Sequence, residues 1–428
     1  MSFMWHNYQD PKKIFVERDR DIIIINSIDN AQVASQFIRA INDGINKGYD
    51  SFCIELDRVS GVFPNAAVPI AGLIEYYSSK GITFEYPDIP TKINHFRIFA
   101  PKEYTPTEHD IMDKVWRFTN SKDVGLIVDA YTEELQKSAM FYPGVLKTIG
   151  WSLNEVMDNV IQHSKVSCGY VMGQIHQRTK NIAFTVFDSG QGIYNSLKDS
   201  KYHPRTPVDA ITLAIQEEIT RDKEIGQGNG LFGLHSIIQK GKGSLSIVSG
   251  RGSYSYFPDG TTKTYPRLPF VSSQNQCTTV DFQLNYAKDM SLGDSLFFRG
   301  KKYEIVNLLL ERYEDDYGHV SYKIKEHAEG TGTRQAAIRV KNEIINIIRE
   351  EKKPITLDFD GVDVMSSSFA DELLAKLFID LGLFQFNLLV KLINIDESLQ
   401  MLLHKSVLQR IVEFMNEGDE GDEEYGVM

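Results

Sequence analysis

The 428-residue sequence predicts an α/β protein in which two small, related modules flank a different central domain. Strand and helix patterns alternate near both ends of the chain, and the pattern changes between them. The segments 54–59 (IELDRV) and 357–362 (LDFDGV) occupy the same place in the two end patterns, each followed shortly by a helix. At roughly 150 residues per domain, the length also favours about three domains.

Each element of the flanking modules follows from its own pattern, because short apolar or β-branched runs alternate with apolar residues at helical spacing. In the first module we expect strands at 21–25, 51–56 and 82–86 and helices at 31–46 and 66–79. In the last module we expect strands at 320–324, 355–359 and 388–392 and helices at 335–348, 368–381 and 397–414. This alternation is typical of a small sheet with helices packed against it.

The expected domain boundaries are an α/β module at 1–95, a helical connector at 96–140 with its helix over 110–140, a central domain at 141–287, a second α/β module at 288–415 and an acidic tail at 416–428. The tail holds six acidic residues among glycines, which predicts a solvated, disordered segment. An interaction tail is the alternative.

Net charge, apolar runs and cysteine positions together argue against several classes of function. The net charge of −12 disfavours binding to nucleic-acid backbones or anionic membranes. The sequence contains no apolar run long enough to span a membrane and no pattern of a secretory signal. The three cysteines lie far apart, so neither a disulfide framework nor a cysteine zinc site is expected. We therefore expect a cytoplasmic protein without nucleic-acid or membrane partners.

The first of four motifs is the helix-like segment 154–164 (NEVMDNVIQHS). Glu155, Asn159 and His163 are spaced i, i+4, i+8 and share its polar face. An acid beside an amide can position a water molecule and a magnesium ion, since hard cations take oxygen ligands and a carboxylate can accept a proton. An ordinary solvated helix face is the alternative.

The other three motifs follow in order. The segment 188–192 (DSGQG) comes directly after the expected strand 182–187, so its Asp188 can accept from the amine of a flat ligand. The segment 226–234 (GQGNGLFGL) leads into a helix, where successive amides can bind phosphate oxygens. It is neither a dinucleotide-binding turn, because helix-like residues precede it, nor a Walker A loop, because no Gly-Lys-Ser/Thr triplet occurs. The segment 277–282 (CTTVDF) is a late strand that offers hydroxyls.

Together the four motifs resemble the Bergerat-fold ATP-binding domain of the gyrase, chaperone, histidine-kinase and MutL (GHKL) superfamily. The first motif also looks like that of the anti-sigma-factor serine kinases. The resemblance implies a central α/β-sandwich domain that binds ATP and Mg2+, with a mobile lid at about 193–225. The sequence departs from the family at Cys277, where the family prefers glycine, and shows no Lys assignable to the γ-phosphate.

The resemblance also implies roles for individual residues. Glu155 aligns with the catalytic carboxylate that activates or orients water, and Asn159 with the magnesium ligand that bridges the phosphates. Asp188 would accept a hydrogen bond from the adenine amine. The remaining ATP-binding residues would shape the adenine side, namely Gly190, Gly192 and Thr278, or wrap the phosphates, namely Gly228, Asn229, Gly230 and Leu231.

The flanking modules resemble STAS-type domains, the fold of anti-sigma-factor antagonists, and the last one looks closer to a STAS-like family of unassigned role. In antagonists the turn after the second strand carries a serine that a partner kinase phosphorylates. Here the expected phosphoacceptors are Ser367 and Ser368, unless these serines only cap the next helix. The first module has Phe63-Pro64-Asn65 at that turn and no hydroxyl. Arg334 could receive an anion, but Thr333 as a helix cap explains the same residues.

The resemblance implies an ATP- and magnesium-dependent switch ATPase whose nucleotide state is read by the STAS-like modules. The alternatives are a protein serine kinase of the anti-sigma type and a nucleotide-binding adaptor that does not hydrolyse ATP. A protein partner would bind through the STAS-like modules, and a homodimer is a further expectation, since many relatives of the ATP-binding domain dimerise. The pathway is left open.

Overall fold

The computed structural model describes residues 13–56, 59, 61–108, 110–216, 230–268, 275–288, 297–298, 301–302, 312–315 and 317–419. It is a mixed α/β structure, as expected. The chain forms two compact units, one made of Met1–Tyr131 with Lys147–Glu304 and one made of Thr132–Leu146 with Ile305–Met428. The helices of one hairpin pass from one unit to the other; they are α4 (Ser121–Ser138) and α5 (Val145–His163).

The amino-terminal module of the first unit contains a sheet in the order β1-β2-β3-β4. Strands β2, β3 and β4 are parallel, and β1 is antiparallel to β2. The elements are β1 (Val16–Asp19), β2 (Ile22–Ile25), α1 (Gln32–Ile45), β3 (Ser51–Glu55), α2 (Pro64–Ser78), β4 (Thr83–Glu85) and α3 (Thr91–Asn94). The expected strands and helices are present in the expected order, and β1 and α3 are additional elements.

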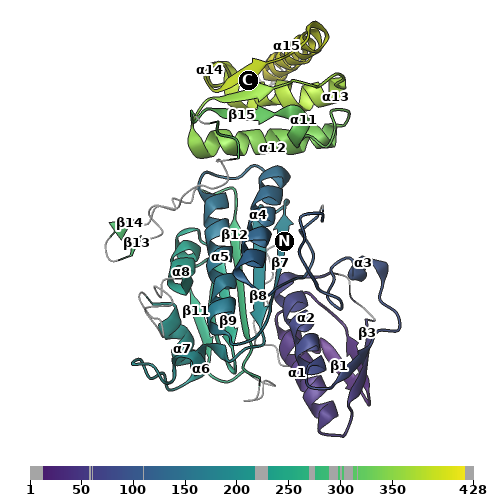
Figure 1. Cartoon of the computed structure of the whole chain (residues 1–428), viewed down its shortest axis with the longest axis vertical. Coiled ribbons are helices and arrows are strands. Elements are labelled where there is room, and N and C mark those ends of the chain that lie inside the picture. Colours follow the sequence, from purple (N-terminus) through teal and green to yellow (C-terminus); the bar gives the residue numbers. More distant parts are fainter. Residues whose placement is uncertain are drawn as a thin grey trace, which may run out of the picture. The chain divides into compact units, whose positions relative to one another are not determined.

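The larger sheet of the first unit has the order β11-β10-β9-β12-β8-β7-β6-β5 (Figure 1). Its strands are β5 (Lys102–Glu103), β6 (Trp116–Phe118), β7 (Gly169–His176), β8 (Asn181–Asp188), β9 (Ser244–Ser249), β10 (Gly252–Tyr256), β11 (Thr262–Tyr265) and β12 (Thr278–Asn285). A short hairpin, β13 (Phe297–Phe298) with β14 (Lys301–Lys302), follows them. The further helices are α6 (Gly192–Leu197), α7 (Pro207–Ala214) and α8 (Gly230–Lys240).

The segment expected to be a helix over 110–140 is helical only from Ser121 onward. Before it, β6 pairs with β7 and extends the larger sheet. Trp116 and Phe118 are fully buried there. The expectation of a continuous helix was wrong at this point. A strand of three residues is too short for its alternation of buried and exposed side chains to stand out in the sequence.

Both faces of the larger sheet are covered, and β8 shows how. The Phe184 ring lies edge-on to Tyr131 of α4, with the ring centroids 5.0 Å apart. Phe187, on the opposite face of the strand, joins an apolar core that includes α2 of the amino-terminal module. Helix α2 is therefore buried between two sheets, which explains why its sequence is apolar nearly all round.

The second unit contains a parallel sheet in the order β15-β16-β17. Its elements are β15 (Val320–Lys323), α11 (Ile324–His327), α12 (Arg334–Glu351), β16 (Ile355–Asp358), α13 (Ser367–Ala370), the π-helical turn η1 (Asp371–Ala375), α14 (Lys376–Leu389), β17 (Val390–Ile393) and α15 (Glu397–Asp419). The expected helices and strands are present, except that the last strand begins at Val390. Helix α15 runs five residues further than expected, into the predicted tail, and 420–428 lie outside the described residues.

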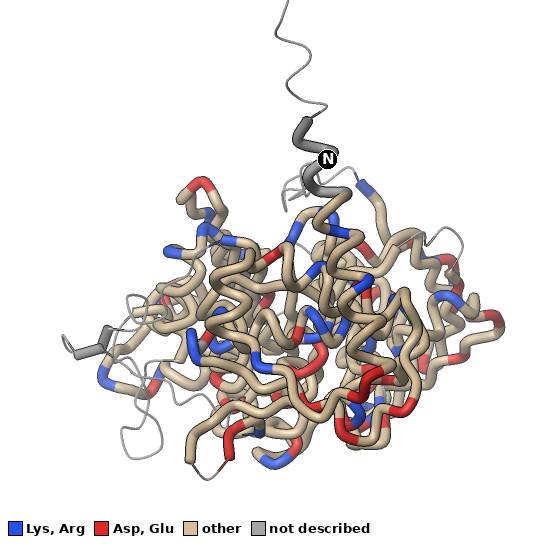
Figure 2. Tube along the Cα trace, turned by 90° about the horizontal axis from the view of Figure 1, so that it is seen from above, with Lys and Arg blue, Asp and Glu red and all other residues tan. Residues whose placement is uncertain are grey.

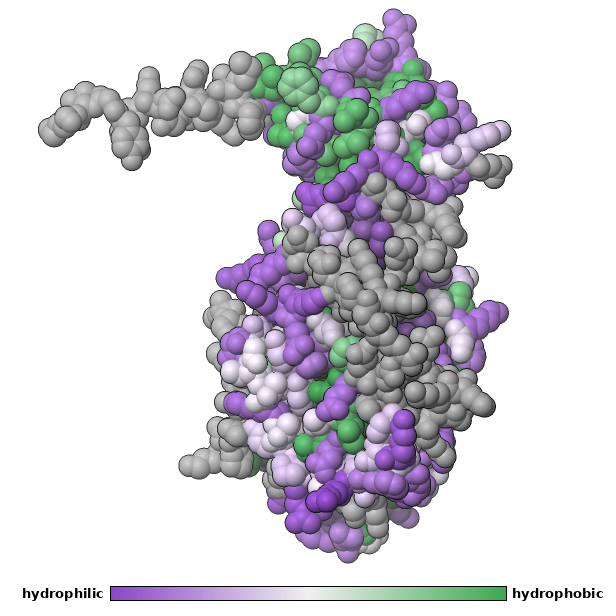
Figure 3. All heavy atoms as spheres, turned by 90° about the vertical axis from the view of Figure 1, so that its left-hand side faces the viewer, coloured by the Kyte–Doolittle hydropathy of each residue, from purple (hydrophilic) through white to green (hydrophobic). Residues whose placement is uncertain are grey.

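Surface character differs between regions. Basic and acidic residues are interspersed along the described trace (Figure 2). Apolar side chains gather on the face of the second unit that Figure 3 shows. Its exposed large apolar residues on α14 and α15 include Leu383, Phe384, Leu388, Met401 and Leu408. Among the described helices, none combines the length and the apolar character that crossing a bilayer requires.

Candidate functional site

The candidate site begins with two side chains on α5. The apolar stripe of this helix is buried in the protein interior and includes Leu153, Val156 and Met157. Glu155 and Asn159 lie one turn apart at the edge of that stripe and are half-buried. Burial, and to a smaller extent the nearby charge of Asp158, raises the pKa of the Glu155 carboxyl. The carboxyl is therefore a better proton acceptor than an exposed glutamate.

The first residue of α8 lies directly against this pair. A Cβ atom placed on Gly230 would be 2.6 Å from Oε2 of Glu155 and 3.2 Å from Nδ2 of Asn159. Only glycine allows the backbone to approach so closely. The Nδ2 atom of Asn159 is buried and has no hydrogen-bond partner among the described residues. The start of α8 and this polar pair thus form one group, although Gly230 lies 71 positions after Asn159 in the sequence.

Asp188 lies at the end of β8 and is only 5% exposed. The amide of Gly190 donates a hydrogen bond of 2.8 Å to its Oδ1 atom. Burial nevertheless outweighs this bond and raises the pKa of Asp188 to about 7. A buried carboxylate with spare acceptor capacity favours a ligand that donates a hydrogen bond.

The loop after Asp188 is tied to the carboxyl end of α5. The backbone amide of Gln191 donates to the carbonyl of Ser164 at 2.9 Å, and its side-chain amide donates to the carbonyl of His163 at 2.7 Å. A Cβ atom on Gly190 would collide with the Ser164 carbonyl, so glycine is required there. These contacts join the helix that carries Glu155 to the strand end that carries Asp188.

Thr278 lies opposite Asp188 in the register of β12 and β8. Its hydroxyl is 3.1 Å from the hydroxyl of Ser249, at the end of β9. Ser249 also accepts a hydrogen bond of 2.8 Å from the amide of Ile193 in α6. Gly192 has a φ of +73°, and a Cβ atom on it would lie 2.5 Å from the Gln276 carbonyl. The second and fourth motifs are therefore in contact through Ser249.

The structure brings most of the predicted site residues into one region of the first unit. They are Glu155, Asn159, Asp188, Gly190, Gly192, Gly230 and Thr278, with Leu231 in the first turn of α8. Gly228 and Asn229 lie outside the described residues, as does the end of the expected lid at 193–225, whose described part contains α6 and α7. Sequence reasoning missed Ser249, because a serine at a strand end has no distinctive pattern of its own.

The chemistry of these side chains suits a magnesium–nucleotide ligand. An asparagine amide supplies the oxygen that a hard cation prefers, and the Nδ2 atom of Asn159 makes no hydrogen bond to any residue that the structure describes. The amide nitrogen and oxygen positions are assigned from the surroundings and can exchange by rotation. The amino end of α8, an eleven-residue helix, offers backbone donors beside it.

The turn that carries the expected phosphoacceptors belongs to the second unit. Ser366, rather than its successors, caps α13, because its hydroxyl accepts from the Phe369 amide at 3.0 Å. Ser367 and Ser368 are exposed. The cap explanation therefore applies to Ser366 and leaves the hydroxyls of Ser367 and Ser368 accessible.

The region around Arg334 agrees with the cap interpretation. Thr333 caps α12 by accepting from the Ala336 amide at 3.2 Å. Arg334 lies 3.4 Å from Oδ2 of Asp371, a carboxylate that Arg410 also binds. The carboxylates of Asp371 and Glu372, at 3.4 and 4.0 Å, already pair with the guanidinium, which argues against an anion site at Arg334.

The hairpin between α4 and α5 is held by α12 within the second unit. Arg339 makes two hydrogen bonds of 2.9 Å to the carboxylate of Glu134 on α4. The buried Asn346 side chain accepts from the Phe141 amide at 2.7 Å, and Glu350 accepts from the Gly144 amide at 2.7 Å. The loop that leads into α5 is therefore fixed to α12, and α5 carries Glu155 and Asn159 about three and four turns further on.

Comparison with known proteins identifies the class of one module. A family model described as a STAS-like domain of unknown function (DUF4325) matches residues 336–400. The carboxy-terminal module is thus STAS-like, as the resemblance of its sequence implied. A search of curated proteins found no match to the chain.

Proposed function

We propose that this protein is an ATP- and magnesium-dependent switch ATPase of the GHKL type, whose nucleotide state is read by STAS-like modules at both ends. One observation carries the proposal: Glu155, Asn159 and Gly230, from two distant motifs, meet at the start of α8. The contacts of Gly190 and Thr278 around Asp188 support it, because they join the two other motifs of the same resemblance.

In this proposal the nucleotide lies on the side of the sheet that α5 and α8 cover. Asp188 accepts a hydrogen bond from the adenine amine, while Gly190, Gly192 and Thr278 shape the adenine side. Asn159 holds magnesium, which when bound neutralises phosphate charge. The backbone at Gly230 and Leu231 binds phosphate oxygens, with Gly228 and Asn229 expected to do the same.

Glu155 then orients a water molecule and accepts its proton as the water oxygen attacks the γ-phosphorus. The bond between that phosphorus and the β–γ bridging oxygen breaks, so the products are ADP and inorganic phosphate. The raised pKa of Glu155, which burial causes, favours this proton transfer. The buried environment also strengthens every electrostatic contact of the site.

The second unit supplies a route by which nucleotide state can be read. Asn346 and Glu350 of the STAS-like module hold the loop before α5, and Glu155 lies on α5. A shift of α5 on nucleotide binding would therefore act on α12 through these bonds. A protein partner that binds this module would sense the shift.

A serine kinase remains the second candidate function, because Ser367 and Ser368 are exposed. In that case the γ-phosphoryl group passes to a serine hydroxyl instead of water. A nucleotide-binding adaptor is the third candidate, but it would not need the acid at Glu155.

The test is incubation of the purified chain with γ-labelled ATP and magnesium, with free phosphate and protein-bound label followed together. Free phosphate without bound label supports the switch ATPase. Label on the protein that a Ser367→Ala/Ser368→Ala double variant loses supports the kinase. ATP binding with neither signal contradicts both enzymatic functions and favours the adaptor.

A further inference from the structure

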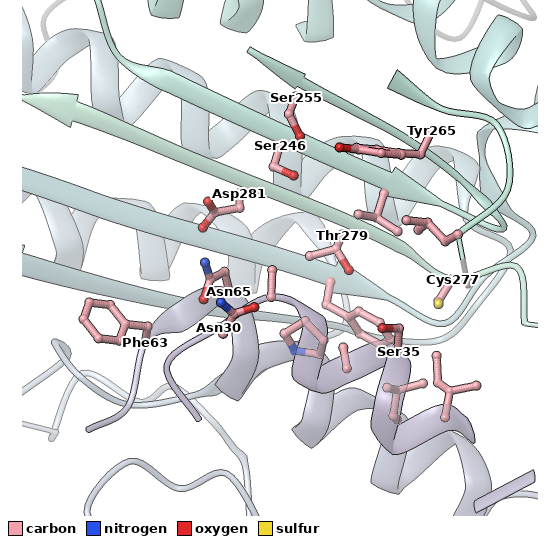
Figure 4. A pocket seen from close by; sticks show the side chains of 18 of the residues that line it. Asn30, Ser35, Phe63, Asn65, Ser246, Ser255, Tyr265, Cys277, Thr279 and Asp281 are labelled. Carbon is pink, nitrogen blue, oxygen red and sulfur yellow. The ribbon is translucent and has the colours of Figure 1, made fainter. Parts of the chain in front are cut away.

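A second cavity lies on the other face of the larger sheet, between the sheet and the amino-terminal module (Figure 4). Its volume is about 380 Å3, which is within the range of small-molecule sites. Helices α1 and α2 form one wall, and strands β9, β10 and β12 form the other. Nothing in the proposed ATPase reaction uses this cavity.

The floor of the cavity carries a buried acid. Asp281 of β12 is only 3% exposed and lines the cavity. Thr185 donates a hydrogen bond of 2.7 Å to its Oδ1 atom, but its Oδ2 atom has no hydrogen-bond partner among the described residues. Burial raises the pKa of Asp281 to about 6, although Thr185 and Gln283 lower it. Burying a carboxylate with an unpaired oxygen costs folding free energy, so such a group usually has a functional role.

The opposite wall presents a second acceptor. Asn65, in the first turn of α2, faces Asp281 across the cavity in Figure 4. Its Oδ1 atom is buried and likewise has no hydrogen-bond partner in the described part of the chain. The Oδ2 atom of Asp281 therefore awaits a donor, and the amide of Asn65 can meet a donor or an acceptor of the same ligand by rotation.

The rest of the lining defines the remaining chemistry of the ligand. Phe63, Phe187 and Leu268 provide apolar walls, and Ser246 adds a hydroxyl beside Asp281, with Ser255 one strand further away. The other charged residues of the lining are Lys13, Asp29 and Lys263, all exposed. The ligand therefore needs a compact apolar body, with its donors at the buried end.

We propose that this cavity binds a small molecule whose cationic head carries several hydrogen-bond donors, of the amidine, guanidine or amine class, with the head paired to Asp281. An amidinium matches a carboxylate because two parallel N–H groups can reach its two oxygens. The site is separate from the ATP site, although β12 carries residues of both on its opposite faces.

The test uses benzamidine as the probe, with benzamide and benzoate as neutral and anionic analogues, in calorimetry or ligand-observed NMR on the full chain. We expect benzamidine to bind with a dissociation constant of about 1 mM or tighter, as a ligand of this size allows. Asp281→Asn should weaken it at least about tenfold, which is the loss expected when a buried charge pair is removed. Benzamide and benzoate should bind more weakly than benzamidine.

Asp259→Asn is the matched control, because Asp259 is an exposed acid in the turn between β10 and β11. It should leave benzamidine binding unchanged. Ser246→Leu should abolish binding by filling the cavity, which tests the location even if Asp281→Asn perturbs the fold. Equal binding by wild type and Asp281→Asn, or no binding by wild type at about 1 mM, would overturn the proposal.

Asp188→Asn separates this site from the proposed ATPase. The variant alters the other face of the sheet, so benzamidine affinity should equal that of the wild type. Loss of benzamidine binding in this variant would contradict a separate site. Failure of the chain to hydrolyse ATP, in contrast, would leave the benzamidine result unaffected.

Discussion

The side chain of Asn346 holds the backbone of Phe141, whose amide donates to Asn346 Oδ1 at 2.7 Å. The same side chain donates to the carbonyls of Gln136 and Ala139, each at 2.8 Å. One buried residue of α12 thus satisfies three backbone groups where α4 ends and the path to α5 begins. An amide is well suited to this position because it can donate and accept at the same time.

Replacing this residue should loosen the hairpin. Asn346→Ala removes three hydrogen bonds to buried backbone groups, so we expect the second unit to lose about 3 kcal/mol of stability. Chemical denaturation measures the loss of stability. Hydrogen exchange of the backbone amides at 136–141 measures the loosening of the hairpin. The exposed Gln335 on the same helix provides the control, since Gln335→Ala should change stability by less than about 0.5 kcal/mol. Equal stability of the two variants would contradict the clamping role.

Glu155→Ala should retain ATP binding and lose turnover, because the carboxylate acts on water rather than on the nucleotide. The expected loss of rate is about 100-fold or more, the range for a general base. Phosphate release and equilibrium binding of ATP are measured on the same preparation. The control is Gln162→Ala, because Gln162 is exposed and lies about two turns after Glu155 on α5. Turnover at the wild-type rate in Glu155→Ala would show that the assigned role is wrong.

Gly230→Ala should impair turnover through a steric clash. The added methyl group would lie 2.6 Å from Oε2 of Glu155, so α8 or Glu155 must move. A displacement of this size typically costs about 100-fold in rate. Gly125→Ala provides the matched control, because a Cβ atom there meets nothing within 4 Å. If Gly230→Ala turns over ATP like this control, the close approach has no catalytic importance.

Adenosine binding should rise with pH around the pKa of Asp188, which is about 7. The ionised carboxylate accepts from the adenine amine more strongly than the protonated carboxyl does, so affinity should be higher at pH 8 than at pH 6, by up to about tenfold. Adenosine is the probe because it has no phosphate to titrate. Asp188→Asn should bind more weakly and without this pH dependence. A wild-type affinity that does not change with pH would argue against Asp188 as the adenine contact.

Asp281→Asn should stabilise the first unit at high pH. The pKa of Asp281 is about 6 in the folded chain and near 3.8 when unfolded, so the folded protein binds the proton more tightly. The wild type therefore becomes less stable as the pH rises from about 4 to 6 and above. The variant keeps an oxygen for the Thr185 hydroxyl and avoids the charge, so it should be more stable by about 2 to 3 kcal/mol at pH 8.

Thermal unfolding at both ends of this pH range checks the prediction. The difference between wild type and Asp281→Asn should shrink toward pH 4 and vanish at about pH 3, where the wild-type carboxyl is protonated in both states. A difference that is constant with pH would show that packing, rather than ionisation, causes the effect.

Much of the structure could be predicted from local patterns. The stripe of α5, the strand before Asp188 and the Thr333 cap all depend on residues within about four positions of one another. The hydrogen bonds and buried faces that define such elements are equally local, so the sequence alone indicates them. The same holds for the repeated strand and helix order of the two flanking modules.

Contacts between distant segments could not be predicted in this way. The pairing of β6 with β7, the burial of α2 between two sheets and the part played by Ser249 each depend on which element lies beside which. A three-residue strand or a lone serine carries too little pattern to reveal its neighbour.

The sequence by itself determined most of the longer helices and strands and the four motifs that include Glu155, Asn159 and Asp188, because helix and strand patterns are local. The tertiary structure alone decided that Gly230 would meet Glu155, that Asn346 would hold Phe141 and that Asp281 would line a cavity. The physical reason is that burial and unsatisfied polar atoms are properties of packing, and packing joins residues that the chain keeps far apart.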